Sequence, residues 1–211
     1  MSRPELLGGG PAVDAPPAAA HRRLAGDAGV WFFITADIAL FAVLFAAFML
    51  ARMDAPQAFE QSHRHLDPAT GTFNTLVLLT SSWLVALAVH AARAGQRATV
   101  RRYLAAGMAV GACFAMSKAV EYSDKIGAGL TMLSNDFFMY YYALTGLHFL
   151  HFVVGMVVLA GCWAKAERDA LDARYLVWLE SSGCYWHMVD LLWIVLFPLL
   201  YLMRLPEAVS T

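Results

Sequence analysis

Five long apolar segments divide the chain, and short polar connections separate each from the next. They run over residues 28–51, 73–92, 103–122, 137–164 and 175–203. About 20 apolar residues suffice for a helix to cross the hydrocarbon of a bilayer, and a spanning segment must satisfy its backbone hydrogen bonds internally. The pattern therefore predicts an all-α polytopic membrane protein, built as a bundle of five transmembrane helices.

The segments outside this predicted bundle are short. Residues 1–27 contain Gly8-Gly9-Gly10-Pro11 and a second cluster of alanine and proline, a composition typical of linkers. We expect a disordered tail over 1–27, a single five-helix domain over 28–204 and a short C-terminal tail over 205–211. The first apolar run is too long for the core of a signal peptide, so we expect it to be retained.

Two local features of the connections and ends are interpreted structurally. The first connection contains His63-Arg64-His65, which we interpret as part of a solvated loop rather than as metal ligands. Pro198 lies late in the last apolar run, where a kink near the membrane exit is tolerated.

Basic residues are distributed unevenly between the two predicted sides of the membrane. Ten Lys and Arg residues lie in the N-terminal tail and the second and fourth connections, and four lie in the other connections and at the C-terminus. Loops rich in Lys and Arg stay in the cytoplasm. We therefore expect a cytoplasmic N-terminus and a C-terminus on the opposite side of the membrane.

Composition agrees with a membrane location and excludes several other classes. Apolar residues make up 60% of the chain and charged residues 15%, so a soluble enzyme of this size is excluded. The formal net charge of −1 gives no reason to expect nucleic acid as a partner. The three cysteines lie in apolar runs without a C-x-x-C spacing, which argues against a disulfide framework or a zinc site.

A small set of polar side chains lies inside the predicted spans, where burying them is costly and usually reflects a role. The set comprises Asp37, Lys118, Glu121, His148, His151, Glu180, His187 and Asp190. Helical phase places Glu180, His187 and Asp190 on one face of the last helix. Since four carboxylates and one lysine cannot all be charged in hydrocarbon, we expect some acids to be protonated or hydrogen-bonded to histidine.

Three kinds of chemistry fit these residues. A metal site would use His148-x-x-His151 and His187-x-x-Asp190, although the repeated Glu-x-x-His of di-iron sites is absent. A haem would need axial histidines on facing helices, and the histidines of the spans do not form the two stacked pairs of a two-haem cytochrome. The third interpretation is a polar cluster, able to handle protons, that ties the helices together. We expect no metal and no cofactor in this chain.

Sequence motifs point to a known family. Glu180 precedes Tyr185-Trp186-His187-Met188-Val189-Asp190-Leu191-Leu192-Trp193, which resembles the last-helix signature of subunit III of the haem–copper oxidases, a glutamate followed by W-Y-W-H-F-V-D-x-x-W. The fourth span has Thr145-Gly146-Leu147-His148-Phe149-Leu150-His151 and then Gly155, similar to the family's T-G-x-H-x-x-H-x-x-x-G. The resemblance covers about residues 26 to 204.

The third and first spans add to the resemblance and also depart from it. Gly111, Phe114, Glu121 and Tyr122 match G-x-x-F-x-x-x-Q-x-x-E-Y, except that Lys118 replaces the glutamine. Asp37 stands where the family has its membrane-embedded glutamate. The long form of the family has seven helices, and this chain begins at the third. Short relatives with these features resemble the NorE-type proteins associated with bacterial nitric oxide reductase, and we favour that form over a short oxidase subunit.

The resemblance implies an accessory subunit that is not catalytic alone. Haem and metal are then expected in a partner, the catalytic subunit of an oxidase or of nitric oxide reductase, and phospholipid is a candidate ligand. Asp37 would be the embedded acid near the partner, handling protons. The other polar residues of the spans, with Lys118, would form the polar interior. Two other classes stay open: a stand-alone proton-coupled transporter, and a membrane metalloenzyme.

Overall fold

The computed structural model describes residues 26–168 and 171–203, and no strand occurs in that part of the chain. Its long helices are α1 (Ala28–Asp54), α3 (Pro68–Arg93), α4 (Arg97–Gly127), α5 (Asp136–Arg168) and α6 (Ala173–Phe197). Each is long and apolar enough to cross a membrane, which confirms the predicted five-span helical fold. The predicted tails, apart from Gly26 and Asp27, lie outside the described residues.

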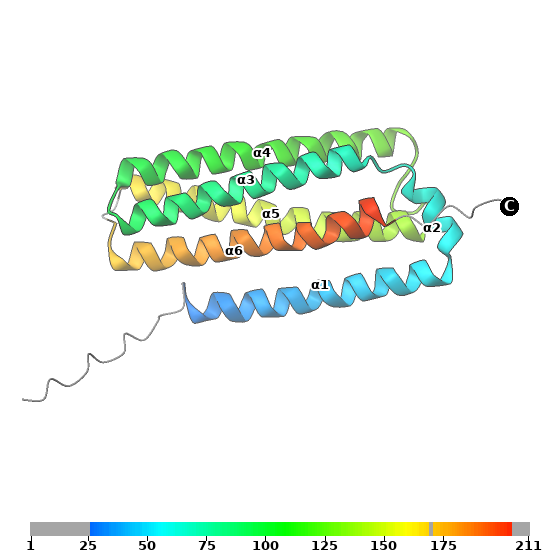
Figure 1. Cartoon of the computed structure of the whole chain (residues 1–211), viewed down its shortest axis with the longest axis horizontal. Helices are drawn as coiled ribbons and strands as arrows, with labels where there is room; N and C mark the ends of the chain where they lie inside the picture. Colours follow the sequence, from blue (N-terminus) through cyan, green and yellow to red (C-terminus); the bar gives the residue numbers. More distant parts are fainter. Residues whose placement is uncertain (1–25, 169–170, 204–211) are drawn as a thin grey trace, which may run out of the picture.

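The five long helices run side by side (Figure 1). Helix α3 packs against α4 and α6, and α5 packs against the same two helices, so these four form the main bundle. Helix α1 lies along α5 and α6 at the edge of the bundle, and much of its outer surface is apolar and exposed. Helix α6 therefore lies between α3 and α1.

Capping residues extend the helices beyond the apolar runs that predict them. Asp67 accepts hydrogen bonds from the backbone N–H groups of Ala69 and Thr70, and Asp172 accepts one from Tyr175, so α3 and α6 each begin before the membrane-spanning run. The Thr70 hydroxyl also donates to Asp67. This bond and the bond from the Ala69 amide lower the pKa of the Asp67 carboxyl.

The sequence did not predict the short helix α2 (Pro56–His63), which follows α1 directly. Pro56 begins it, a position where the missing N–H costs nothing. Phe59 is buried against Phe48 and Phe137, which fixes α2 to α1 and α5. His63 is buried against Phe137, so the expectation of a solvated loop at this residue was wrong.

Glycines of α4 and α5 allow both helices to pack closely against Trp186 of α6. Trp186 is fully buried, and a Cβ atom on Gly155 would lie 2.7 Å from its ring. A Cβ atom on Gly111 would lie 3.4 Å from the same ring. On the neighbouring pair of helices, the Ser81 hydroxyl of α3 donates to the Gly107 carbonyl of α4 at 2.8 Å. Small residues at these positions thus permit close helix packing.

The last helix continues past its proline. Pro198–Leu202 form a π-helical turn, closed by a bond of 3.1 Å from the Met203 N–H to the Pro198 carbonyl. Proline has no N–H to donate, and a wider turn is one way to rearrange the backbone ladder around it. The turn places Tyr201 fully inside the bundle.

Candidate functional site

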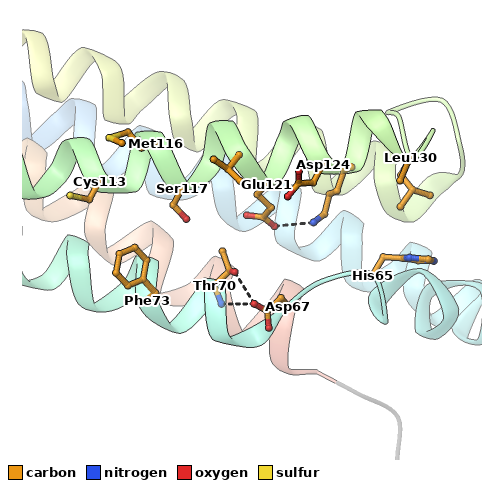
Figure 2. A pocket seen from close by; sticks show the side chains of 13 residues that line it. His65, Asp67, Thr70, Phe73, Cys113, Met116, Ser117, Glu121, Asp124 and Leu130 are labelled. Carbon is orange, nitrogen blue, oxygen red and sulfur yellow. Dashed lines mark hydrogen bonds and ion pairs between the residues drawn. The ribbon is translucent and has the colours of Figure 1, made fainter.

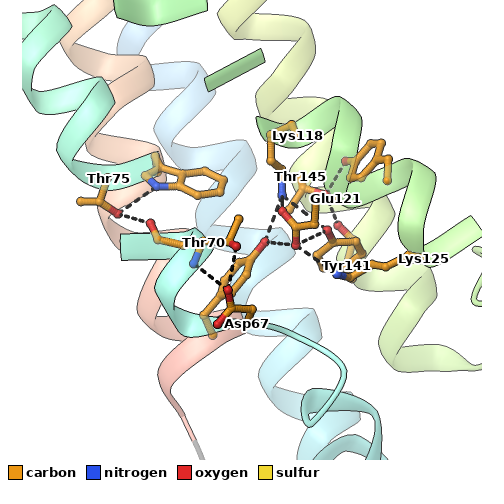
Figure 3. Close-up of polar contacts among 12 residues, drawn as sticks. Asp67, Thr70, Thr75, Lys118, Glu121, Lys125, Tyr141 and Thr145 are labelled. Atoms are coloured by element: carbon orange, nitrogen blue, oxygen red, sulfur yellow. Dashed lines mark hydrogen bonds and ion pairs between the residues drawn. The ribbon is translucent and has the colours of Figure 1, made fainter. Parts of the chain in front are cut away.

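A buried ion pair lies near the end of the bundle where α4 finishes. Lys118 is 1% exposed, and its ammonium donates to the Glu121 Oε2 atom at 2.8 Å, to the Tyr201 hydroxyl at 3.0 Å and to the Tyr141 hydroxyl at 3.4 Å. An ammonium has three protons to donate. All three therefore have an acceptor, from α4, α5 and the turn after α6 (Figure 3).

The Glu121 carboxylate, which accepts hydrogen bonds in this cluster, also has several donors within the chain. The Glu121 Oε1 atom accepts from the Tyr201 hydroxyl at 2.7 Å, the Tyr141 hydroxyl at 2.8 Å and the Lys125 ammonium at 3.2 Å. Every lone pair of a buried carboxylate needs a donor, because nothing in hydrocarbon supplies one. We name Lys118, Glu121, Lys125, Tyr141 and Tyr201 the Lys118 cluster.

Aromatic rings surround the Lys118 ammonium. It lies 5.3–5.6 Å from the ring centres of Tyr122, Tyr141, Trp193 and Tyr201. Ring faces carry partial negative charge and attract a cation at such distances, more strongly where water is excluded. Lys118 is thus paired with a carboxylate and enclosed by aromatic side chains.

A pocket of about 740 Å³ opens beside this cluster (Figure 2). Glu121 and Lys125 line it from α4, and Asp67 and Thr70 line it from the start of α3. Its other wall is apolar and runs along α4 through Cys113, Met116 and Val120. The pocket therefore has a polar end near the helix termini and an apolar end within the membrane-spanning part of α4.

Asp37 of α1 and His151 of α5 form a second buried contact. The His151 Nε2 atom lies 3.0 Å from the Asp37 Oδ1 atom, and Asp37 is 5% exposed. The His151 Nδ1 atom lies 2.8 Å from the Leu147 carbonyl, which can only accept, so Nδ1 carries a proton. A second proton must then lie between Nε2 and Oδ1. The pair is then neutral overall, as a membrane interior requires, and a close acid–histidine contact of the predicted kind is present.

His148 faces the centre of the bundle, one turn before His151. It is fully buried, and its Nε2 atom lies 3.0 Å from the Val189 carbonyl of α6. Its ring packs against Phe114 and Trp193. His148 thus joins α5 to α6 by one hydrogen bond and aromatic contacts.

The three polar residues of α6 share one face, as helical phase predicts, and the structure turns that face towards α3. Glu180 accepts from the Nε and Nη2 atoms of Arg93 at 2.9 and 2.7 Å. The His187 Nδ1 atom forms a short hydrogen bond with the Ser82 hydroxyl. Asp190 is buried and faces Ser82 without a hydrogen bond of good geometry.

The structure therefore distributes the predicted residues over several separate contacts along the bundle. It joins Lys118 with Glu121 and Asp37 with His151. It also places His187 and Asp190 beside the same α3 residue, Ser82. Sequence reasoning missed Tyr141, Tyr201, Ser82 and Arg93, although tyrosines within apolar spans were a usable signal. Within residues 26–168 and 171–203, no three His, Cys, Asp or Glu side chains are placed to hold a metal ion.

Comparison with known proteins gives the family. The family model for cytochrome c oxidase subunit III matches residues 21–204, which include all five spans and every contact described above. The chain belongs to the cytochrome c oxidase subunit III family. Curated relatives agree. Cytochrome c oxidase subunit 3 of Synechocystis sp. is 30% identical over 176 residues, covering 83% of this chain and 74% of the relative.

Other members of the subunit III family are similar over comparable lengths. Cytochrome c oxidase subunit 3 of Thermostichus vulcanus is 29% identical, covering 83% of this chain and 86% of its own. The protein of that name from Corynebacterium diphtheriae is 25% identical over 189 residues, covering 89% and 92%. The resemblance inferred from the motifs of α4, α5 and α6 is thereby confirmed at the level of the family.

Proposed function

We propose that this chain is an accessory subunit of a bacterial respiratory oxidase, bound to a haem-carrying catalytic subunit in the inner membrane. The observation that carries the proposal is the match to subunit III over residues 21–204. Its own polar groups support a structural role, since the Lys118 cluster and the Asp37–His151 pair each hold helices together by hydrogen bonds. Electron transfer and oxygen chemistry then belong to the partner.

We place the N-terminus in the cytoplasm and the C-terminus in the periplasm. The distribution of Lys and Arg residues supports this orientation. The Arg93–Glu180 ion pair is then at the cytoplasmic end, and the Lys118 cluster and its pocket are at the periplasmic end. The polar and apolar ends of that pocket suit a phospholipid, with its headgroup near Lys125 and Asp67 and its acyl chain along Met116 and Val120.

Asp37 and His151 are the residues through which this subunit would affect the supply of protons to the catalytic subunit. Their shared proton is held in a neutral pair near the edge of the bundle, on the loosely packed helix α1. Release of that proton to a partner group would leave a neutral histidine beside a charged Asp37 carboxylate, so a second proton must follow to restore the neutral pair. Asp37→Asn should leave assembly intact and slow sustained turnover of the complex, measured as oxygen consumption over many turnovers between pH 6 and 8.

The direct test of the proposed function is purification of the tagged full-length chain from its native membrane in a mild detergent. We expect a haem-carrying catalytic subunit to co-purify in a fixed ratio, detected by its absorption spectrum and identified by mass spectrometry. An unrelated membrane protein with the same tag is the control. Recovery of the chain without haem would contradict the proposal and favour a stand-alone transporter.

A nitric oxide reductase is the second candidate partner. The five-span form, Asp37 in place of glutamate and Lys118 in place of glutamine favour the NorE-type branch. The same purification distinguishes the two candidates. A catalytic subunit that reduces oxygen supports the first, and one that reduces nitric oxide supports the second.

A further inference from the structure

A groove that carries several polar side chains lies on the surface between α3 and α6. Its volume is about 180 Å³, and the residues that line it are Ala86, Val89, His90, Arg93, Glu180, Gly183, Cys184 and His187. We name it the α3/α6 groove. Histidine, arginine and glutamate side chains are unusual on a surface that faces lipid, because lipid tails offer no hydrogen bonds.

His187 is a residue of this groove that an apolar environment would leave unsatisfied. It lies at the middle of the span Ala173–Leu202 and is exposed, and its Nδ1 atom bonds to Ser82 at a similar depth in α3. Within the described part of the chain, its Nε2 atom has no hydrogen-bond partner. A ring nitrogen left in hydrocarbon without a partner costs free energy.

Two exposed threonines of the spans differ from His187 in one respect. The Thr80 hydroxyl donates to the Leu76 carbonyl at 2.8 Å, and the Thr35 hydroxyl donates to the Trp31 carbonyl at 2.9 Å. Each of these groups is satisfied by its own helix and is compatible with lipid. His187 projects a free nitrogen outward instead, so its surroundings must supply the partner.

A second unpaired group lies just behind this surface. Asp190 follows His187 by one helical turn and is 3% exposed, and neither of its carboxylate oxygens has a hydrogen-bond partner among the described residues. A buried carboxyl without partners costs free energy as well. Ser82, His187 and Asp190 therefore form an incomplete hydrogen-bonding group, open on the side of the groove.

The shape of the groove suits a helix. The small residues Ala86, Gly183 and Cys184 line it, and a Cβ atom on Gly183 would lie 3.6 Å from the Val89 side chain, so Gly183 lies where α6 approaches α3. Small residues let a neighbouring transmembrane helix approach closely. Trp83 lies at the rim, one turn before Ala86, and is 63% exposed. Further along α6, Leu191 and Ile194 continue the exposed stripe with apolar side chains.

We propose that the α3/α6 groove binds a transmembrane helix of the haem-carrying catalytic subunit. That helix presents a hydrogen-bonding side chain to the His187 Nε2 atom at mid-membrane depth and a small side chain over Ala86 and Gly183. The inference rests on the proposed function, because it names the face through which the accessory subunit binds its partner. Hydrogen-bond complementarity selects a protein helix over lipid, whose tails cannot bond to His187.

Site-specific photocrosslinking tests the proposal on the full-length chain in native membranes. Trp83 is replaced by p-benzoylphenylalanine, an aromatic residue of similar size. The matched control carries the same group at Val157 of α5, which is 66% exposed. Val157 follows His148 by nine residues, so it points away from the bundle centre that His148 faces.

We expect illumination to link position 83 to the catalytic subunit at least 10-fold more efficiently than position 157. Equal linkage at both positions, linkage mainly at 157, or linkage of position 83 to a second copy of this chain would each overturn the proposal. If position 83 links to lipid alone while the wild-type chain still co-purifies with haem, the groove does not bind the catalytic subunit. The proposed function would then still hold. Absence of haem from the wild-type purification would instead contradict the proposed function.

A variant that fills the groove gives an independent measurement. Ala86→Trp should reduce the haem recovered per chain by at least 10-fold, whereas Val157→Trp should leave it unchanged. The amount of chain in the membrane and its thermal unfolding midpoint in detergent confirm that both variants fold. Full haem recovery with a folded Ala86→Trp variant would overturn the proposal.

Discussion

The Lys118 cluster and the α3/α6 groove both contain charged or polar side chains in the membrane-spanning part of the bundle. The two regions differ in where these side chains find their hydrogen-bond partners. Lys118 and Glu121 are buried, and every donor of the ammonium has an acceptor within the chain. His187 is exposed at mid-span, and its Nε2 atom has no partner in the described residues. The first region is complete in the isolated chain, whereas the second is complete only when another molecule is bound.

This difference separates residues that hold the fold from residues that bind a partner. Removing a member of the complete cluster should lower the stability of the isolated chain strongly, because it leaves a buried charge uncompensated. Removing a polar side chain of the α3/α6 groove should change the stability of the isolated chain little and should weaken its binding to the catalytic subunit more. The following variants test that contrast, beginning with the largest expected effect.

Glu121→Ala should lower the free energy of unfolding of the isolated chain by about 3–5 kcal/mol, since it leaves the Lys118 ammonium buried without a carboxylate. Equilibrium unfolding in mixed detergent micelles measures the change. The control is Arg101→Ala, which removes a partly exposed ion pair with Glu167 and should cost about 1 kcal/mol or less. Equal losses in the two variants would show that the cluster has no special role.

Asp37→Leu should cost about 1–3 kcal/mol, because it leaves the His151 Nε2 atom buried without a partner. The double variant Asp37→Leu/His151→Leu removes both polar groups and should recover most of the loss. The same unfolding measurement applies to both. Strictly additive losses would mean that the two side chains do not interact, contrary to the geometry of the pair.

Ser82→Ala should have the smallest effect, about 0.6 kcal/mol in the isolated chain, the average for a hydrogen bond between membrane helices. Thr80→Val, which removes an exposed hydroxyl bonded to its own helix, is the matched control and should change less. A loss for Ser82→Ala as large as that for Glu121→Ala would remove the distinction between the two regions.

The apolar pattern alone predicts the five spans, because a helix in lipid needs only length and hydrophobicity. It does not predict α2, whose amphipathic sequence is held by the contacts of Phe59 with α1 and α5. The apolar pattern also does not predict where α3 and α6 begin, since Asp67 and Asp172 cap these helices before the apolar runs.

The candidate site could be predicted only where its members share one helix. Lys118 and Glu121 are three residues apart, so their contact follows from helical geometry. Tyr201 enters the same cluster from 80 residues away through a π-helical turn, which no local pattern indicates. Similarly, helical phase places His187 and Asp190 on one face of the last helix, but only packing turns that face to α3 and determines that His187 is exposed and Asp190 buried.

An electron cryo-microscopy structure of the complex purified through the tagged chain tests the central claim most directly. The account predicts a haem-carrying subunit with a transmembrane helix against α3 and α6, and a side chain of that helix hydrogen-bonded to His187. A map in which lipid covers this face while the catalytic subunit contacts the outer side of α4 and α5 would contradict the account.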